Sequence, residues 1–192
     1  MLVLVGKSCS GKNTIQDILV DKYEMDRVVT CTTRPIRKGE KNNISYHFLR
    51  NKEFDKYEAE DMFAETADYH VATGDIRRYG SLKEDYEDSD NKVIILNPKG
   101  LKSIRDKGIP IYAVQLFVPD TCILQRIKNR NDGYRESRRR LEADKKDFKN
   151  IIDLIDISIP NGDFRTPEET AQIIFDEYQN YLLLKECNGA ED

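Results

Sequence analysis

The first residues of the chain that could do chemistry lie in a glycine-bounded segment near its start. Residues 6–13 read GKSCSGKN, which fits the pattern G-x-x-x-x-G-K with an asparagine after the lysine. At this spacing successive backbone N–H groups can surround a phosphate, and Lys12 can reach the β- and γ-phosphates of a nucleotide. The pattern predicts an ATP phosphate loop formed by Gly6, Lys7, Ser8, Cys9, Ser10, Gly11, Lys12, Asn13 and Thr14.

The residue after the lysine bears on metal binding. A serine or threonine hydroxyl usually stands there and contacts Mg²⁺, whereas this chain has Asn13, followed by the hydroxyl of Thr14. An amide oxygen can also be a ligand of Mg²⁺, although it carries no charge. We therefore expect Mg²⁺ to arrive with ATP, held mainly by the β- and γ-oxygens, and Asn13 to contact it weakly, directly or through water.

A second group of charged residues lies on a polar segment further along the chain. Residues 32–40 read TTRPIRKGE, and residues 46–48 read YHF. The guanidinium groups of Arg34 and Arg37 can grip one phosphate dianion from two sides, and the phenol of Tyr46 can add a further donor. This segment therefore predicts a site for a second phosphate group.

Together the two segments resemble guanylate kinase, whose pattern is T-T-R-x-x-R-x-G-E followed by Y-H-F. The chain is also similar to that family in residues 63–67 (FAETA), 79–81 (YGS) and 159–161 (IPN), so the resemblance covers nearly its whole length. Additional residues separate the motifs at 63–67 and 79–81, and we expect a lengthened hairpin between them.

For the acceptor substrate, the resemblance implies a role for each matching residue. The GMP phosphate would be bound by Arg34, Arg37, Tyr46 and Tyr79. The guanine edge would be read by Thr30, Glu65 and Ser81, with Glu40 supporting the site. A carboxylate suits guanine because the N1–H and N2–H₂ groups are adjacent donors. Asn97 stands where the family usually has an aspartate and is counted with the GMP-binding residues.

For ATP, the resemblance implies an arginine-rich lid that closes over the phosphates, with Arg126, Arg130 and Arg140, and a contact near adenine from Asn161. No side chain needs to attack, because catalysis would come from aligning two anions in line and neutralising their charge. The residues expected to act directly in catalysis are Lys12, Arg34, Arg130 and Arg140.

Strands that alternate with helices must position these residues. Short apolar runs predict strands at 2–5, 28–31, 92–96, 111–118 and 155–159, and apolar spacing predicts helices at 12–23, 99–106, 120–150 and 166–184. This alternation indicates an α/β fold with a parallel sheet flanked by helices. Residues 42–78 have a different character, with a short helix and strand-like pieces at 63–65 and 69–72.

We therefore expect one guanylate-kinase-like domain over residues 1–192. Its P-loop NTPase core would comprise residues 1–31 and 82–192, with a small mixed α/β GMP-binding insertion at about 32–81 and the lid at about 129–141.

Composition narrows the class of protein. The 192 residues carry 31 Lys and Arg against 35 Asp and Glu, a net charge of −4, which argues against bulk nucleic-acid binding. No apolar run approaches the length that spans a bilayer, and the start lacks a basic n-region. The four cysteines have no zinc spacing. We expect a cytoplasmic protein with no membrane or nucleic-acid partner, either a monomer or a homodimer.

The function that follows is transfer of the γ-phosphoryl group of ATP to GMP or dGMP. One alternative is a kinase of the same fold that acts on another phosphate acceptor such as a ribose bisphosphate, but it would not be expected to keep TTRPIRKGE with YHF. Another is a catalytically silent guanylate-kinase-like binding module, which usually lacks the phosphate loop. Assays with ATP and a panel of acceptors discriminate between the three.

Overall fold

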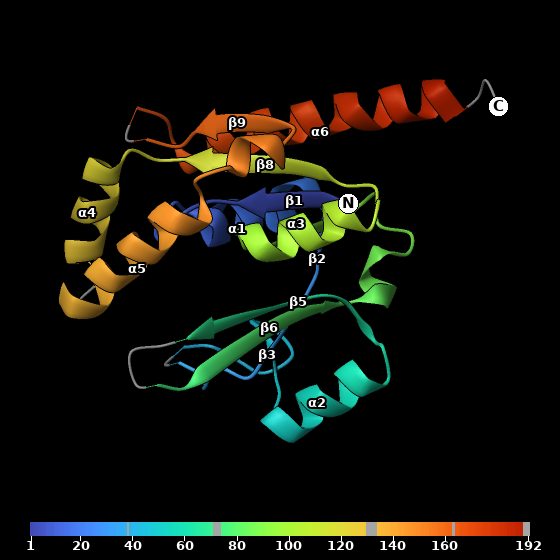
Figure 1. The fold of residues 1–192 in the computed structure, drawn as a ribbon. Helices are drawn as coiled ribbons and strands as arrows, with labels where there is room; N and C mark the ends of the chain where they lie inside the picture. The colour runs from blue at the N-terminus through green and yellow to red at the C-terminus, as the bar shows by residue number, and fades with distance from the viewer. Residues whose placement is uncertain (38, 71–73, 130–133, 163, 190–192) are drawn as a thin grey trace.

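The computed structural model describes residues 1–37, 39–70, 74–129, 134–162 and 164–189. Its strands form two sheets, and helices pack against them (Figure 1). The larger sheet is parallel throughout and has the order β2-β7-β1-β8-β9. Its strands are β1 (Leu2–Val5), β2 (Asp26–Arg27), β7 (Lys92–Ile95), β8 (Tyr112–Phe117) and β9 (Ile157–Pro160). Its helices are α1 (Lys12–Tyr23), α3 (Pro98–Asp106), α4 (Asp120–Asn129), α5 (Tyr134–Asp147) and α6 (Pro167–Gly189).

The sequence of β1, LVLV, explains its central place in this sheet. All four residues are buried, and alternate side chains of a strand point to opposite faces. Val3 and Val5 pack on the α3 side with Leu101, while Leu2 and Leu4 pack on the side of α1 and α6. A strand buried on both faces needs a continuous apolar run. The segment that follows β1 is therefore anchored to the middle of the core.

The smaller sheet has the order β4-β3-β6-β5, in which β3 is parallel to β4 and antiparallel to β6. Its strands are β3 (Cys31–Thr32), β4 (His47–Phe48), β5 (Phe63–His70) and β6 (Ile76–Leu82). Helix α2 (Asn51–Ala59) covers the face turned away from the larger sheet (Figure 1), where Phe54 stacks on Phe63 with ring centroids 4.5 Å apart. Short 3₁₀ turns at Lys83–Tyr86 and Ile151–Asp153 complete the described elements.

The parallel sheet with flanking helices confirms the predicted α/β class, and two details of the strands differ from the sequence prediction. The strand predicted at 28–31 is wrong, because this stretch carries the chain from one sheet to the other: Val28 N–H donates to Val93 in β7, and the Thr30 carbonyl accepts from His47 in β4. The pieces predicted at 63–65 and 69–72 form one strand, β5, up to His70.

The helices also differ from prediction toward the end of the chain. Residues 120–150 form two helices, α4 and α5, with residues 130–133 between them outside the described part. The last helix continues to Gly189, five residues beyond the predicted end at Leu184.

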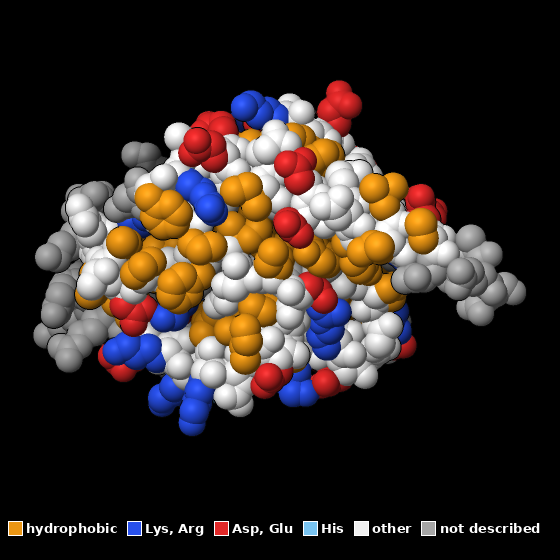
Figure 2. Space-filling model, turned by 90° about the horizontal axis from the view of Figure 1, so that it is seen from above, with side chains coloured by type: hydrophobic (Ala, Val, Ile, Leu, Met, Phe, Trp, Pro, Cys, Tyr) orange, Lys and Arg blue, Asp and Glu red, His pale blue; other side chains and the backbone are white. Residues whose placement is uncertain are grey.

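The surface formed by α6 and β9 carries a band of hydrophobic side chains with charged groups between and around them (Figure 2). Exposed large hydrophobic residues of this part of the molecule include Phe117 at the end of β8 and Leu183 and Leu184 on α6. Among the described residues, no helix has both the length and the apolar character needed to cross a membrane.

Candidate active site

The loop between β1 and α1 has a backbone path that two glycines make possible. A Cβ on Gly6 would lie 2.5 Å from Ser10 Oγ and 2.9 Å from the Leu116 carbonyl oxygen. Gly11 has a φ of +95°, and a Cβ there would lie 2.7 Å from Asn161 Nδ2. Neither site has room for a side chain, so the spacing of the two glycines fixes the curl of the loop around the position of a phosphate.

The side chains of the loop differ in what they contact. Lys12 Nζ donates to the carbonyl oxygens of Gly6 at 2.7 Å and Lys7 at 3.0 Å, so the ammonium group lies over the loop. Lys7 itself pairs with Asp120 at 2.6 Å and lines neither cavity described below. Of these two predicted ATP-binding lysines, only Lys12 faces a cavity.

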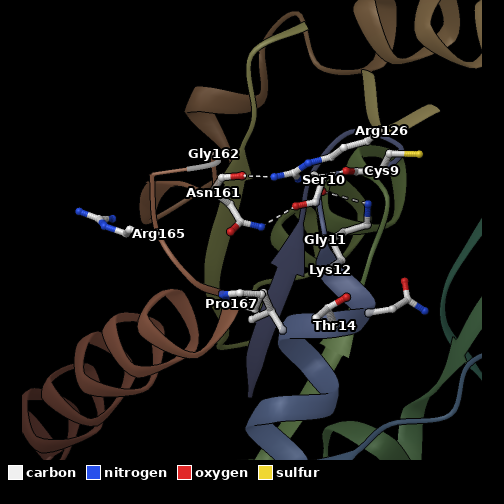
Figure 3. Close-up of a pocket in the computed structure, with 12 residues that line it drawn as sticks. Cys9, Ser10, Gly11, Lys12, Thr14, Arg126, Asn161, Gly162, Arg165 and Pro167 are labelled. Atoms are coloured by element: carbon white, nitrogen blue, oxygen red, sulfur yellow. Dashed lines mark hydrogen bonds between the residues drawn. The ribbon is translucent and has the colours of Figure 1, made fainter. Parts of the chain in front are cut away.

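A first cavity of about 440 Å³ lies on the α6 side of the loop (Figure 3). Arg126 donates to the carbonyl oxygens of Cys9 at 3.3 Å and Asn161 at 3.0 Å, and Asn161 Nδ2 donates to the Ser10 carbonyl at 2.7 Å. Its walls contain most of the predicted ATP-binding residues: Cys9, Ser10, Gly11, Lys12, Asn13, Thr14, Arg126 and Asn161. Arg165, which sequence reasoning missed, also lines this cavity.

A second cavity of about 340 Å³ lies between the loop and the smaller sheet. Its walls include the following predicted residues: Gly6, Ser8, Cys9, Lys12, Asn13, Thr30, Arg37, Tyr46, Glu65, Tyr79 and Asn97. Cys9, Lys12 and Asn13 line both cavities, so the two meet at the phosphate loop. Residues far apart in the sequence therefore surround one place where two phosphate groups could approach each other.

Glu65 is the buried acid of the second cavity, with only 3% of its surface exposed. Its Oε1 accepts a hydrogen bond from Ser81 Oγ at 3.1 Å, while its Oε2 has no partner in the described part of the chain. Burial raises the pKa of this carboxyl to about 7. Gly100 makes room for it, because a Cβ there would lie 2.5 Å from Oε2. Glu65 thus presents an acceptor that the protein itself leaves unsatisfied.

Two other residues predicted for the guanine site, Ser81 and Asn97, use their side chains in hydrogen bonds to other groups of the protein. Ser81 is fully buried and does not line the cavity, since its hydroxyl bonds Glu65 and lies 2.9 Å from the Tyr86 hydroxyl. Asn97 lines the cavity, but its side-chain oxygen accepts from Gly100 N–H at 2.9 Å and caps the start of α3. An N-cap needs an acceptor, which asparagine supplies as well as aspartate.

The two predicted phosphate-gripping arginines have different positions. Arg34 is buried and makes a two-pronged pair with Glu40 at 2.7 and 3.0 Å, with its guanidinium carbon 5.2 Å from the centre of the Tyr46 ring. Glu40 also accepts from the Arg37 N–H at 2.8 Å. Only Arg37 lines the cavity. The structure therefore places Arg34 as a brace of the loop that presents Arg37.

Among the residues of the second cavity that sequence reasoning missed, four have polar or charged side chains: Tyr69, Arg77, Asp144 and Asp147. Tyr69 and Arg77 alternate with Glu65 and Tyr79 on their strands, so a period of two was the available signal. Asp144 accepts from the Ser8 N–H of the phosphate loop at 2.8 Å, and burial raises the pKa of its carboxyl. No local sequence signal indicates a contact between residues so far apart.

Two predicted catalytic residues cannot be placed. Arg130 lies outside the described residues, and Arg140 belongs to α5 but its side chain lies outside the described part.

Comparisons with known proteins find chains that are similar in sequence and in fold. A family model described as guanylate kinase matches residues 1–177. A guanylate kinase of Campylobacter jejuni is 30% identical over 184 residues, covering 91% of this chain and 86% of that protein, and one of Nostoc sp. is 28% identical, covering 90% and 87%. The crystal structure of guanylate kinase from Anaplasma phagocytophilum superimposes with a TM-score of 0.66 at 21% identity, covering 94% and 85% of the two chains, which establishes the fold.

Proposed function

The chain belongs to the guanylate kinase family, and on this premise we propose that it transfers the γ-phosphoryl group of ATP to GMP or dGMP where its two cavities meet. The observation that carries this function is the Glu65 carboxylate, which lines a cavity shared with Lys12 and whose Oε2 has no hydrogen-bond partner in the described part of the chain. A ribose bisphosphate offers only hydroxyl groups to that carboxylate and lacks the adjacent N1–H and N2–H₂ donors of a guanine edge. A silent binding module does not need the intact phosphate loop, so neither alternative is favoured.

The acceptor binds in the second cavity with guanine at Glu65. The N1–H and N2–H₂ donors of guanine satisfy both oxygens of an ionised carboxylate, whereas adenine has no such adjacent pair. The Ser81 hydroxyl holds the Glu65 carboxylate in place through its hydrogen bond to Oε1. The acceptor phosphate lies beside Arg37, with the phenols of Tyr46 and Tyr79 as further donors.

ATP binds through the phosphate loop, with adenosine in the first cavity beside Asn161 and Arg126. Lys12 leaves the carbonyl oxygens of its own loop and contacts the β- and γ-phosphates. The reaction is then an in-line displacement in which the protein aligns the two anions and neutralises charge. Arg130 and Arg140 join this set as lid residues on the strength of the family resemblance alone.

A kinase that uses ATP requires a divalent metal ion, and we take it to be Mg²⁺. Among the described residues no three His, Cys, Asp or Glu side chains form a metal-binding group. Residues with oxygen-bearing side chains that line the second cavity include Asn13, Asp144 and Asp147. This sparse donor set fits an ion that arrives with ATP and keeps its phosphate ligands and waters. When bound, the ion supplies positive charge to the phosphates.

Binding of both substrates must also rearrange the site. We propose that the lid at about 129–141 and the GMP-binding insertion at about 32–81 move toward the core and exclude water, which suppresses hydrolysis of ATP. The contact of Asp144 with the Ser8 N–H is one that has to break.

The test is an ADP-release assay with ATP and GMP, dGMP, AMP, CMP, UMP or ribose bisphosphate as acceptor. We expect turnover with GMP and dGMP only. Glu65→Gln should lose most GMP turnover while it keeps ATP binding, and the exposed Glu87→Gln should match the parent protein. Faster turnover with a ribose bisphosphate, or GMP binding without turnover, would show that one of the alternatives is right.

A further inference from the structure

Strand β6 carries two adjacent arginines, Arg77 and Arg78, whose side chains point to opposite faces of the smaller sheet. Arg78 lies on the α2 side, where its guanidinium pairs with Asp55 at 2.5 Å and Glu58 at 2.6 Å and lies 3.6 Å from Asp68. The protein itself therefore neutralises the charge of Arg78, and this side chain holds α2 against the sheet.

Arg77 lies on the other face and lines the second cavity, as do Tyr79, two residues along the strand, and Tyr69, its partner on β5. Within the described ranges, no carboxylate lies at ion-pair distance from its guanidinium. Asp144 and Asp147 line the same cavity from α5 but make no ion pair with Arg77. An arginine that faces a cavity without an acidic partner is suited to an anion that enters from outside.

The register of the β5–β6 hairpin gives the position of Arg77 relative to the substrates. Glu65 pairs with Ser81, Ala67 with Tyr79, and Tyr69 with Arg77. Guanine lies at the first of these pairs and the acceptor phosphate near the second. Arg77 follows one step further from the guanine end, about 7 Å along the strand. In direct transfer, the phosphoryl group that moves lies next to the acceptor phosphate. We place it on the side away from guanine, where Arg77 lies.

Because Arg34 is paired with Glu40, fewer arginines of the predicted set are available to balance the phosphate charges in the second cavity. Of the two arginines that the sequence analysis assigned to the acceptor phosphate, Arg34 is held by Glu40 away from the cavity. Arg37 and Lys12 remain, and the two substrates bring several phosphate charges to one site. Arg77 provides a third cation of the protein at the same cavity.

We propose that Arg77 binds the phosphoryl group in transfer, a role that rests on the proposed function. In the reaction, the bond between the γ-phosphorus of ATP and the β–γ bridging oxygen breaks, and a bond forms between that phosphorus and a phosphate oxygen of GMP. Arg77 donates hydrogen bonds to the oxygens of the moving group and exchanges no proton with it. After transfer this group is the β-phosphate of GDP, so Arg77 contacts GDP at an atom that GMP lacks.

The test compares Arg77→Gln, Arg77→Lys and the matched variant Arg78→Gln, and it measures calorimetric affinities for GMP and GDP, kcat with ATP and GMP, and Tm. Loss of a charge-assisted contact corresponds to about 10- to 100-fold. Arg77→Gln should weaken GDP binding by about that factor, change GMP binding less than about threefold, and lower kcat, while Arg77→Lys restores part of both losses. Arg78→Gln should lower Tm and keep the parental ratio of GDP to GMP affinity.

Other outcomes overturn the proposal. Equal weakening of GMP and GDP by Arg77→Gln places the side chain at the acceptor phosphate instead. A fall in Tm with an unchanged affinity ratio and kcat shows a structural role like that of Arg78. If the parent protein does not phosphorylate GMP, the proposed function itself fails and the role of Arg77 fails with it, whereas an active parent with an unchanged ratio refutes Arg77 alone.

Discussion

Replacing Glu65 by glutamine should make the ligand-free protein more stable at alkaline pH, although it removes the group proposed to recognise guanine. The side chain is 3% exposed, and burial raises the pKa of its carboxyl from 4.5 to about 7. Because each pH unit of difference corresponds to about 1.4 kcal/mol, keeping the ionised carboxylate buried costs the folded state about 3 kcal/mol. Glutamine has nearly the same shape without the charge.

The pH dependence of this effect has a definite sign. Below pH 4.5 the Glu65 carboxyl is neutral in both the folded and unfolded states, so it adds nothing. Between pH 4.5 and about 7 the folded protein retains a proton that the unfolded chain has released, and the free energy of unfolding falls as pH rises. Above pH 7 the difference is constant. The variant should therefore exceed the parent by about 2–3 kcal/mol at pH 8.5 and by less than about 1 kcal/mol at pH 5.

Urea unfolding followed by circular dichroism at these two pH values measures the effect. Glu87→Gln is the matched control, since it makes the same chemical change at an exposed site and should alter the free energy of unfolding by less than about 0.5 kcal/mol at both pH values. Equal stability of parent and Glu65→Gln at pH 8.5, or an equal gain at both pH values, would refute the argument that the buried charge is the cause.

Three further predictions concern the substrates and the metal. Arg37→Lys should weaken GMP binding by about 1–3 kcal/mol, because a point charge cannot replace the guanidinium fork, and leave ATP affinity nearly unchanged; equal losses for both nucleotides in calorimetry would contradict the assignment. Gly100→Ala should displace the Glu65 carboxylate, from which its Cβ would lie 2.5 Å, and so raise KM for GMP more than KM for ATP. Calorimetric titration of the nucleotide-free protein with Mg²⁺ should show no stoichiometric site at low-millimolar concentrations, and tight binding would contradict the proposal that the ion arrives with ATP.

Sequence patterns predicted those parts of the site that depend on local backbone geometry. The phosphate loop follows from two glycines at fixed spacing after a buried strand, and both are sterically required in the structure. The acid at Glu65 and the phenols at Tyr46 and Tyr79 followed from motifs that match a known family, and all three line the second cavity.

Competition between side chains and long-range packing could not be predicted in the same way. Nothing in TTRPIRKGE indicates that Arg34 pairs with Glu40 while Arg37 faces the cavity, because the choice depends on how the loop folds back on itself. The alternation of side chains along β6 puts Arg77 on the same face as Tyr79. This could be predicted only if residues 76–82 were first recognised as one continuous strand. The contact of Asp144 with Ser8 joins residues 136 positions apart, and it depends on how α5 packs against the loop.

The hydrogen bond from Ser8 N–H to Asp144 makes occupancy of the phosphate loop a competition between two anions, one of which belongs to the chain. The apparent affinity for ATP is then its intrinsic affinity reduced by the fraction of molecules in which this carboxylate has left the loop. A small anion such as inorganic phosphate would contact little more than the N–H groups of the loop. Its binding energy would therefore offset less of the cost of displacing the Asp144 carboxylate. In the binding mode proposed above, ATP would also contact the first cavity, which Arg126 and Asn161 line. The contact between Asp144 and Ser8 in the ligand-free protein would therefore weaken the binding of small phosphate anions more visibly than that of a complete nucleotide.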